Sequence, residues 1–130
     1  MKRDVYSGFL QLFGEEHKDT LIEAVNYGSS LNYQRRFKEA KALFRKIIPV
    51  AQRILGESSD LTLRMRWLYA MTLYRDDAAT LDDVREAVTT LEETERIARR
   101  VLGGAHPTVV PIGKTLQDAR RALRAREGTA

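Results

Sequence analysis

The chain has 130 residues, of which 43% are hydrophobic and 31% are charged, and its formal net charge at pH 7 is +4. This composition fits one folded domain with a core of its own and argues against a disordered chain. The lack of cysteine excludes disulfides, thiolate metal sites and cysteine nucleophiles, and no apolar run approaches the roughly 18 residues that a membrane-spanning helix needs.

A short phrase recurs three times along the chain. It reads Phe-Gly-Glu-Glu-His-Lys-Asp-Thr-Leu at residues 13–21, Leu-Gly-Glu-Ser-Ser-Asp-Leu-Thr-Leu at 55–63 and Leu-Gly-Gly-Ala-His-Pro-Thr-Val at 102–109. The glycines of successive copies are 42 and 47 residues apart. Such a period is typical of repeat arrays, in which each unit is too small to bury its own apolar face and must stack on its neighbours.

The segment before the first glycine, residues 1–13, predicts a leading half-unit. It has neither the apolar core nor the small-residue cleavage site of a signal peptide, and we therefore expect a cytoplasmic protein that does not bind membranes. Its apolar residues lie where the second helix of a preceding repeat would lie. These residues are Val5, Tyr6, Phe9, Leu10, Leu12 and Phe13.

Residues 14–55 predict a first helix-turn-helix repeat. Asp19 or Thr20 can cap a helix that runs to about Tyr33, and residues 34–36 form the turn. A second helix follows, with an apolar stripe at helical spacing, in which Pro49 removes one backbone hydrogen bond and should introduce a kink. The stripe consists of Phe37, Ala40, Phe44, Ile47, Ala51 and Ile54.

Residues 56–102 predict a second repeat. Its first helix, residues 60–74, is apolar on nearly every side and should therefore be the buried, central helix. The turn after it carries a five-residue insertion relative to the first repeat, and Thr80 is the expected N-cap of a helix to about Leu102.

Residues 103–126 predict a capping helix, because the helical pattern from about Thr108 has only one apolar stripe. Its opposite side is polar, and residues 102–130 have an excess of basic side chains. The stripe consists of Val109, Ile112, Leu116, Ala119 and Leu123.

The recurring phrase resembles the inter-repeat signature of kinesin-light-chain-type tetratricopeptide repeats, which have the same 42-residue spacing. Gly28 with Ala70, and Ala40 with Ala87, match the small positions of the general tetratricopeptide pattern, where helices approach closely. The resemblance implies an all-α solenoid of tetratricopeptide-like helix-turn-helix repeats. One feature departs from the family: of the asparagine pair that its first helices commonly carry, only Asn26 is present.

The resemblance also implies a concave groove lined by the first helix of each repeat. On the helix of residues 60–74, Trp67, Met71 and Tyr74 share one face, with a basic residue on either side. The alternative is that Trp67 and Met71 are only core between repeats. The predicted groove residues are Val25, Asn26, Ser29, Asn32, Arg64, Trp67, Met71, Tyr74, Arg75, Lys114, Asp118 and Arg121.

We therefore predict a non-catalytic protein interaction module that binds a peptide segment or a partner helix. An aromatic floor with basic walls suits an acidic partner with an apolar anchor. No catalytic, cofactor or metal motif is found, and His17 and His106, at equivalent places in the phrase, are expected to act structurally at helix starts.

Two other classes of function remain open. The first is a structural role in which the end helices assemble copies of the chain or join it to a larger array. The second is nucleic-acid binding, disfavoured because aromatic residues are not interleaved with the cations. The residues in question are Arg99, Arg100, Lys114, Arg120, Arg121 and Arg124.

Overall fold

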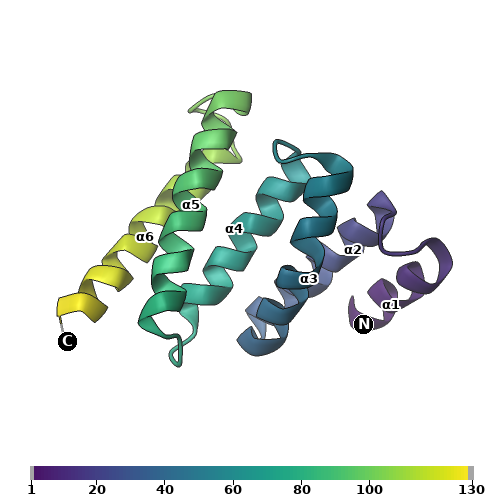
Figure 1. The fold of residues 1–130 in the computed structure, drawn as a ribbon, viewed down its shortest axis with the longest axis horizontal. Coiled ribbons are helices and arrows are strands. Elements are labelled where there is room, and N and C mark those ends of the chain that lie inside the picture. The colour runs from purple at the N-terminus through teal and green to yellow at the C-terminus, as the bar shows by residue number, and fades with distance from the viewer. Residues whose placement is uncertain (1, 129–130) are drawn as a thin grey trace.

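The structure, a computed structural model, describes residues 2–128 as a row of helices (Figure 1). The helices are α1 (Lys2–Phe13), α2 (Lys18–Tyr33), α3 (Phe37–Leu55), α4 (Asp60–Arg75), α5 (Leu81–Leu102) and α6 (Val109–Gly128). No β-strand occurs within that range. The predicted all-α class is therefore confirmed, and the last helix extends two residues beyond its predicted end.

The helices form a solenoid with two layers. Each helix packs on its neighbours in the chain, and α4 additionally contacts α2 and α6. In Figure 1, α3 and α5 lie in front of α2 and α6. We call α2, α4 and α6 the inner layer and α1, α3 and α5 the outer layer. Because α4 contacts four other helices, it is the central helix, as its nearly continuous apolar sequence predicts.

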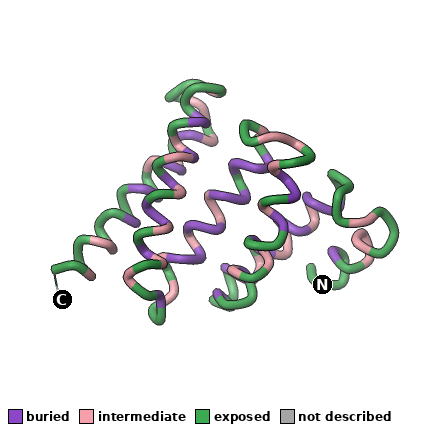
Figure 2. The backbone as a smooth tube through the Cα atoms, viewed as in Figure 1, coloured by how far each residue is buried: buried purple, intermediate pink, exposed green. Residues whose placement is uncertain are grey.

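Buried residues recur along one side of most helices and along most of α4 (Figure 2). Small residues allow the closest approaches between helices. A Cβ atom added at Gly28 on α2 would lie 2.4 Å from Cζ of Phe44 on α3, a separation that real contacts do not reach. Ala40, Ala70 and Ala87 are completely buried. The paired small positions are therefore points where the helices pack closely, as expected from the resemblance.

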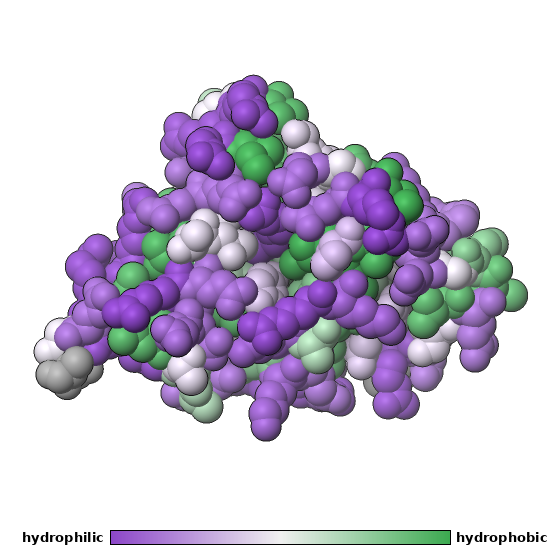
Figure 3. Space-filling view, viewed as in Figure 1, coloured by the Kyte–Doolittle hydropathy of each residue, from purple (hydrophilic) through white to green (hydrophobic). Residues whose placement is uncertain are grey.

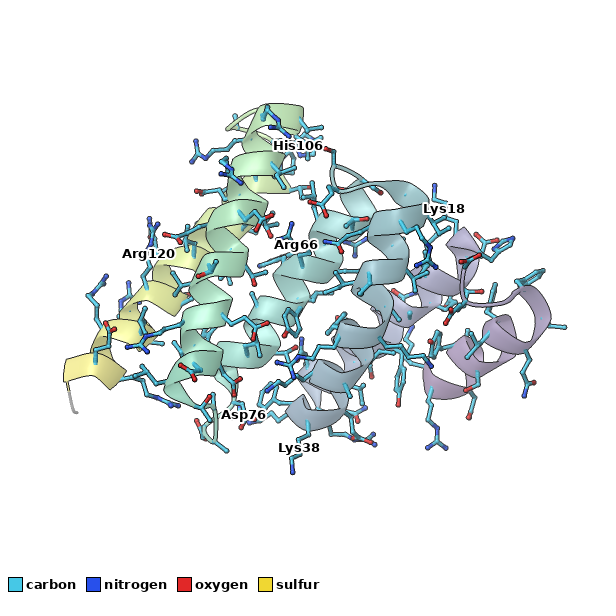
Figure 4. The ribbon with its side chains drawn as sticks, in the orientation of Figure 1. Lys18, Lys38, Arg66, Asp76, His106 and Arg120 are labelled. Atoms are coloured by element: carbon cyan, nitrogen blue, oxygen red, sulfur yellow. The ribbon has the colours of Figure 1, made fainter. Side chains whose placement is uncertain are left out.

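The recurring phrase forms the turns that precede α2, α4 and α6. Gly14, Gly56 and Gly103 have φ angles of 84°, 92° and 89°, a conformation that glycine adopts without a steric penalty. These turns lie at one edge of the stack, near Lys18 and His106, whereas Lys38 and Asp76 mark the turns at the opposite edge (Figure 4).

The histidines of the phrase cap backbone groups, as expected. Nδ1 of His17 accepts a hydrogen bond from the Asp19 N–H at 3.1 Å, and Nδ1 of His106 accepts one from the Thr108 N–H at 3.1 Å. The prediction that Asp19 or Thr20 caps α2 is wrong, because His17 is the N-cap. Thr20 is buried, and its hydroxyl donates instead to the carbonyl of Phe9 on α1.

Two further details concern α3 and α5. Ile54 does not continue the buried stripe of α3, because 42% of its surface is exposed. Pro49 lies on the exposed side of α3, which continues to Leu55, so the missing hydrogen bond is on the solvent side.

Thr80 caps α5 as predicted and forms a reciprocal capping box with Asp83.

Candidate functional site

The candidate site is the inner face, the side of α2, α4 and α6 that points away from the outer layer. All twelve predicted groove residues lie on these three helices. They differ in accessibility: Ser29, Arg64, Arg75, Lys114, Asp118 and Arg121 are exposed, Asn26, Trp67, Met71 and Tyr74 are partly buried, and Val25 and Asn32 are buried.

The first part of the inner face is a cleft of about 280 Å³ between α2 and α4. Val25, Asn26 and Arg64 line it together, although Arg64 is far from the other two in the sequence. Helical spacing explains the arrangement, because residues 22, 25 and 26 lie on one side of α2 and residues 61 and 64 lie on the facing side of α4. The cleft therefore combines an apolar floor with an amide, two cations and one carboxylate, that of Asp60.

Trp67 lies at the middle of the inner face. Its indole Nε1 donates a hydrogen bond to Thr115 Oγ1 on α6 at 2.9 Å, and this bond orients the ring between the two helices. Because the only polar atom of the indole is already bonded, the ring surface that remains accessible is apolar. Trp67 packs against the core without being fully buried, so it combines elements of both alternatives considered from the sequence.

Asn32 lies inside the contact between α2 and α4. Its Nδ2 donates to the carbonyl of Leu68 at 3.2 Å, and its Oδ1 lies 2.7 Å from the Thr72 hydroxyl, which is also 2.9 Å from the same carbonyl. Only 4% of Asn32 is exposed, so its amide joins the helices beneath the inner face. Val25 is similarly buried, and neither residue offers a large surface to a ligand.

At the carboxyl end of α4, several charged side chains lie close together on the inner face. Burial, and next the charge of Asp118 on α6, raise the pKa of Tyr74, whereas Arg75 acts in the opposite direction. Asp118 also accepts a hydrogen bond from Arg121 at 3.3 Å. Tyr74, Asp118, Arg75 and Arg121 therefore lie near one another, and the charge of Arg121 is partly neutralised by its neighbour.

The other cations of the inner face have no such partner. Arg64, Arg75 and Lys114 form no ion pair with an acidic side chain of residues 2–128. Several arginines elsewhere do pair with acidic residues from distant parts of the chain. These pairs are Arg45 with Glu86 at 3.4 Å, Arg53 with Glu16 at 2.6 Å and Arg120 with Glu92 at 2.9 Å.

Three residues of the inner face are missing from the sequence-based set. Lys18 and Ile22 line the cleft between α2 and α4, and Tyr33, which is 90% exposed, follows on the same side of α2. The 42-residue period contains the signal that could have found two of them. Ile22 corresponds to Arg64 and Tyr33 corresponds to Arg75, and both arginines belong to the predicted set.

Other kinds of site find little support in the described part of the chain. No group of three or more histidine or acidic side chains within residues 2–128 could hold a metal ion. None of the helices in that range combines the length and the apolar character that crossing a bilayer requires.

The comparison with known proteins agrees with this architecture. A family model described as a tetratricopeptide repeat matches residues 25–60, which cover most of α2, all of α3 and the turn before α4. No curated protein and no solved structure matches the chain significantly. The match identifies a tetratricopeptide-type repeat within the helical solenoid, and repeats of this type generally act as protein interaction modules.

Proposed function

We propose that the inner face binds a peptide segment or a helix of a protein partner and that the chain has no catalytic activity. One observation carries the proposal: Arg64, Arg75 and Lys114 are exposed without ion-pair partners and lie around the partly exposed Trp67 and Met71. A cationic surface with an apolar centre favours an acidic segment that carries one apolar anchor.

Electrostatics favour an acidic partner. Cations that form no internal pair can bind a carboxylate without first breaking an existing contact. Because Arg64 lies near the start of α4 and Arg75 at its end, the two are separated by roughly 17 Å of helix. A bound segment could therefore contact both cations only if it extended along the inner face.

The apolar centre supplies the anchor site. Trp67 offers only apolar ring surface, as described above, and Met71 one turn later has a flexible thioether that adapts to different side chains. A leucine or phenylalanine of the partner can cover both residues. Burial of this kind at the middle of an interface contributes much of the binding free energy.

Trp67 is the only tryptophan of the chain, so its fluorescence reports directly on the proposed site. We expect tryptophan-free peptides rich in aspartate and glutamate, with one leucine or phenylalanine, to change this fluorescence in a saturable and salt-dependent way. Peptides with lysine in place of the acids should not.

A matched pair of variants tests the location. Arg64→Glu with Lys114→Glu should weaken binding by more than about tenfold. Arg96→Glu with Arg100→Glu on the outer helix α5 makes the same change in net charge and should have little effect. If none of the acidic peptides binds, or if the α5 variant loses as much affinity as the inner-face variant, the proposal is wrong.

The finer identity of the protein is part of the same proposal. The kinesin-light-chain-type resemblance rests on the recurring phrase and its 42-residue period. With it we propose the division into a half-unit (1–13), two repeats (14–55 and 56–102) and a capping helix (103–126), as well as a cytoplasmic location.

Nucleic-acid binding is the weaker alternative. Of the six cations considered for it, three are already paired within the protein. Arg99 pairs with Glu95 at 3.7 Å, Arg120 with Glu92 at 2.9 Å and Arg121 with Asp118 at 3.3 Å. These carboxylates reduce the positive potential that phosphate binding requires.

A further inference from the structure

The outer helix α1 has several exposed apolar residues beside its contact with α2. It contacts α2 and no other helix of residues 2–128. Tyr6 faces α2 and stacks on Tyr27 with ring centroids 5.9 Å apart. Beside this contact, Val5, Leu12 and Phe13 are 41%, 78% and 51% exposed, and the Phe13 ring centroid lies 4.8 Å from that of His17. Phe9 lies beside them, with its ring centroid 5.6 Å from that of Phe13.

These four residues form one surface, which we call the end stripe: Val5, Phe9, Leu12 and Phe13. Spacings of 4, 3 and 1 residues place them on one side of the helix. Figure 3 shows apolar atoms gathered at the end of the molecule that α1 forms. An exposed apolar surface of this kind at the end of a stack indicates an interaction site.

The two ends of the solenoid differ, and this difference disfavours stacking of copies from end to end. The side of α6 that points away from the stack is exposed and carries mostly polar residues, namely Gln117, Arg120 and Arg124, together with Val110, which is 45% exposed. Placing the end stripe of one copy on this surface would bury cations against apolar side chains, which is unfavourable. The end stripe is complementary to another end stripe instead.

The charges at the two ends of α1 favour an antiparallel arrangement. Lys2 precedes Val5 by three residues and therefore belongs to the same side of the helix, and Glu15 lies just beyond the other end of the helix. Both are exposed, and neither forms an ion pair with a residue of the described range. A two-fold axis through the middle of the stripe brings Lys2 of one copy near Glu15 of the other.

We propose that two copies of this chain associate through their end stripes, with the α1 helices antiparallel. The two-fold axis passes near Phe9, so that Val5 of one copy packs against Leu12 and Phe13 of its partner. A parallel arrangement would place the two Lys2 side chains together. This dimer leaves the inner face of each copy open, so it does not depend on the proposed peptide binding.

Sedimentation over a range of protein concentrations tests the association. The wild-type chain should form a dimer whose population rises with concentration. Leu12→Glu should abolish the dimer without loss of helical circular dichroism. Val101→Glu is a matched control, because Val101 is also a partly exposed apolar residue (47%) at the end of a helix, and it should leave the dimer unchanged.

Charge reversal tests the orientation. Lys2→Glu and Glu15→Lys should each weaken the dimer by roughly three- to tenfold, the effect expected for two symmetry-related exposed pairs. An equal mixture of the two variants should restore wild-type association, because the mixed dimer regains both pairs. The proposal fails if the wild-type chain is monomeric throughout, if Leu12→Glu still dimerises, if Val101→Glu disrupts the dimer equally, or if mixing restores nothing.

Discussion

The hydroxyl of Tyr69 on α4 donates a hydrogen bond to Glu86 Oε2 on α5 at 2.6 Å. The same hydroxyl oxygen accepts a bond from Arg45 Nε on α3 at 2.9 Å. Arg45 also pairs with Glu86 at 3.4 Å, so the successive helices α3, α4 and α5 meet at one phenol. Burial, and next the bond to Glu86, raise the pKa of Tyr69 to about 12, whereas Arg45 lowers it.

This contact predicts that the protein loses stability in alkaline solution. Tyrosine in the unfolded chain has a pKa of about 10, so between about pH 10 and pH 12 the unfolded state releases a proton that the folded state retains. The free energy of unfolding should therefore fall as the pH rises through this window. Urea denaturation at several pH values measures it.

Tyr69→Phe provides the control for this prediction. The variant should be less stable near neutral pH, because Arg45 and Glu86 lose a shared partner, but its stability should decline less steeply above pH 10. Burial also raises the pKa values of Tyr6 and Tyr74, so part of the decline should remain. An identical decline in both proteins would show that Tyr69 does not contribute.

Gly28→Ala should destabilise the protein, although alanine normally favours a helix. The added Cβ would meet the Phe44 ring at 2.4 Å, and overpacking of this kind costs about 1 to 3 kcal/mol. Gly8→Ala is the matched control, since nothing lies within 4 Å of its added Cβ. The control should gain about 0.5 to 1 kcal/mol from helix propensity. Thermal denaturation distinguishes the two, and a gain in both would contradict the close approach.

Ala40→Leu should also lower the midpoint of thermal denaturation. Ala40 is completely buried on α3, and the larger side chain should cost roughly 1 to 3 kcal/mol. Ala42→Leu on the exposed side of the same helix should change stability by no more than about 0.5 kcal/mol. An unchanged midpoint for Ala40→Leu would mean that the helix pair can separate to accept the added volume.

His17→Ala should weaken the start of α2, because the Asp19 N–H loses its acceptor. Loss of an N-cap typically costs about 0.5 to 2 kcal/mol, and His17→Asn should recover much of that loss by supplying another acceptor. Chemical denaturation of the three proteins measures the difference. Equal stability of the Ala and Asn variants would show that the cap contributes little.

The sequence by itself determined the helices and their order. The glycines that end helices and the period of the apolar residues act over a few neighbouring residues, and the 42-residue recurrence is visible directly in the sequence. None of these signals requires knowledge of the fold. The central place of α4 followed in the same way, because a helix that is apolar on nearly every side must be covered on nearly every side. The capping role of Thr80 was equally local.

Only the tertiary structure decided which candidate residues remain accessible. Asn32 and Ser29 are both polar residues of α2, yet Asn32 is buried against Thr72 while Ser29 is exposed. Similarly, Arg66 and Arg64 lie two residues apart, but Arg66 is buried beside Glu93 at 3.1 Å, whereas Arg64 lines the open cleft. Burial and pairing depend on which neighbouring helix covers each side, and that neighbour comes from a distant part of the chain.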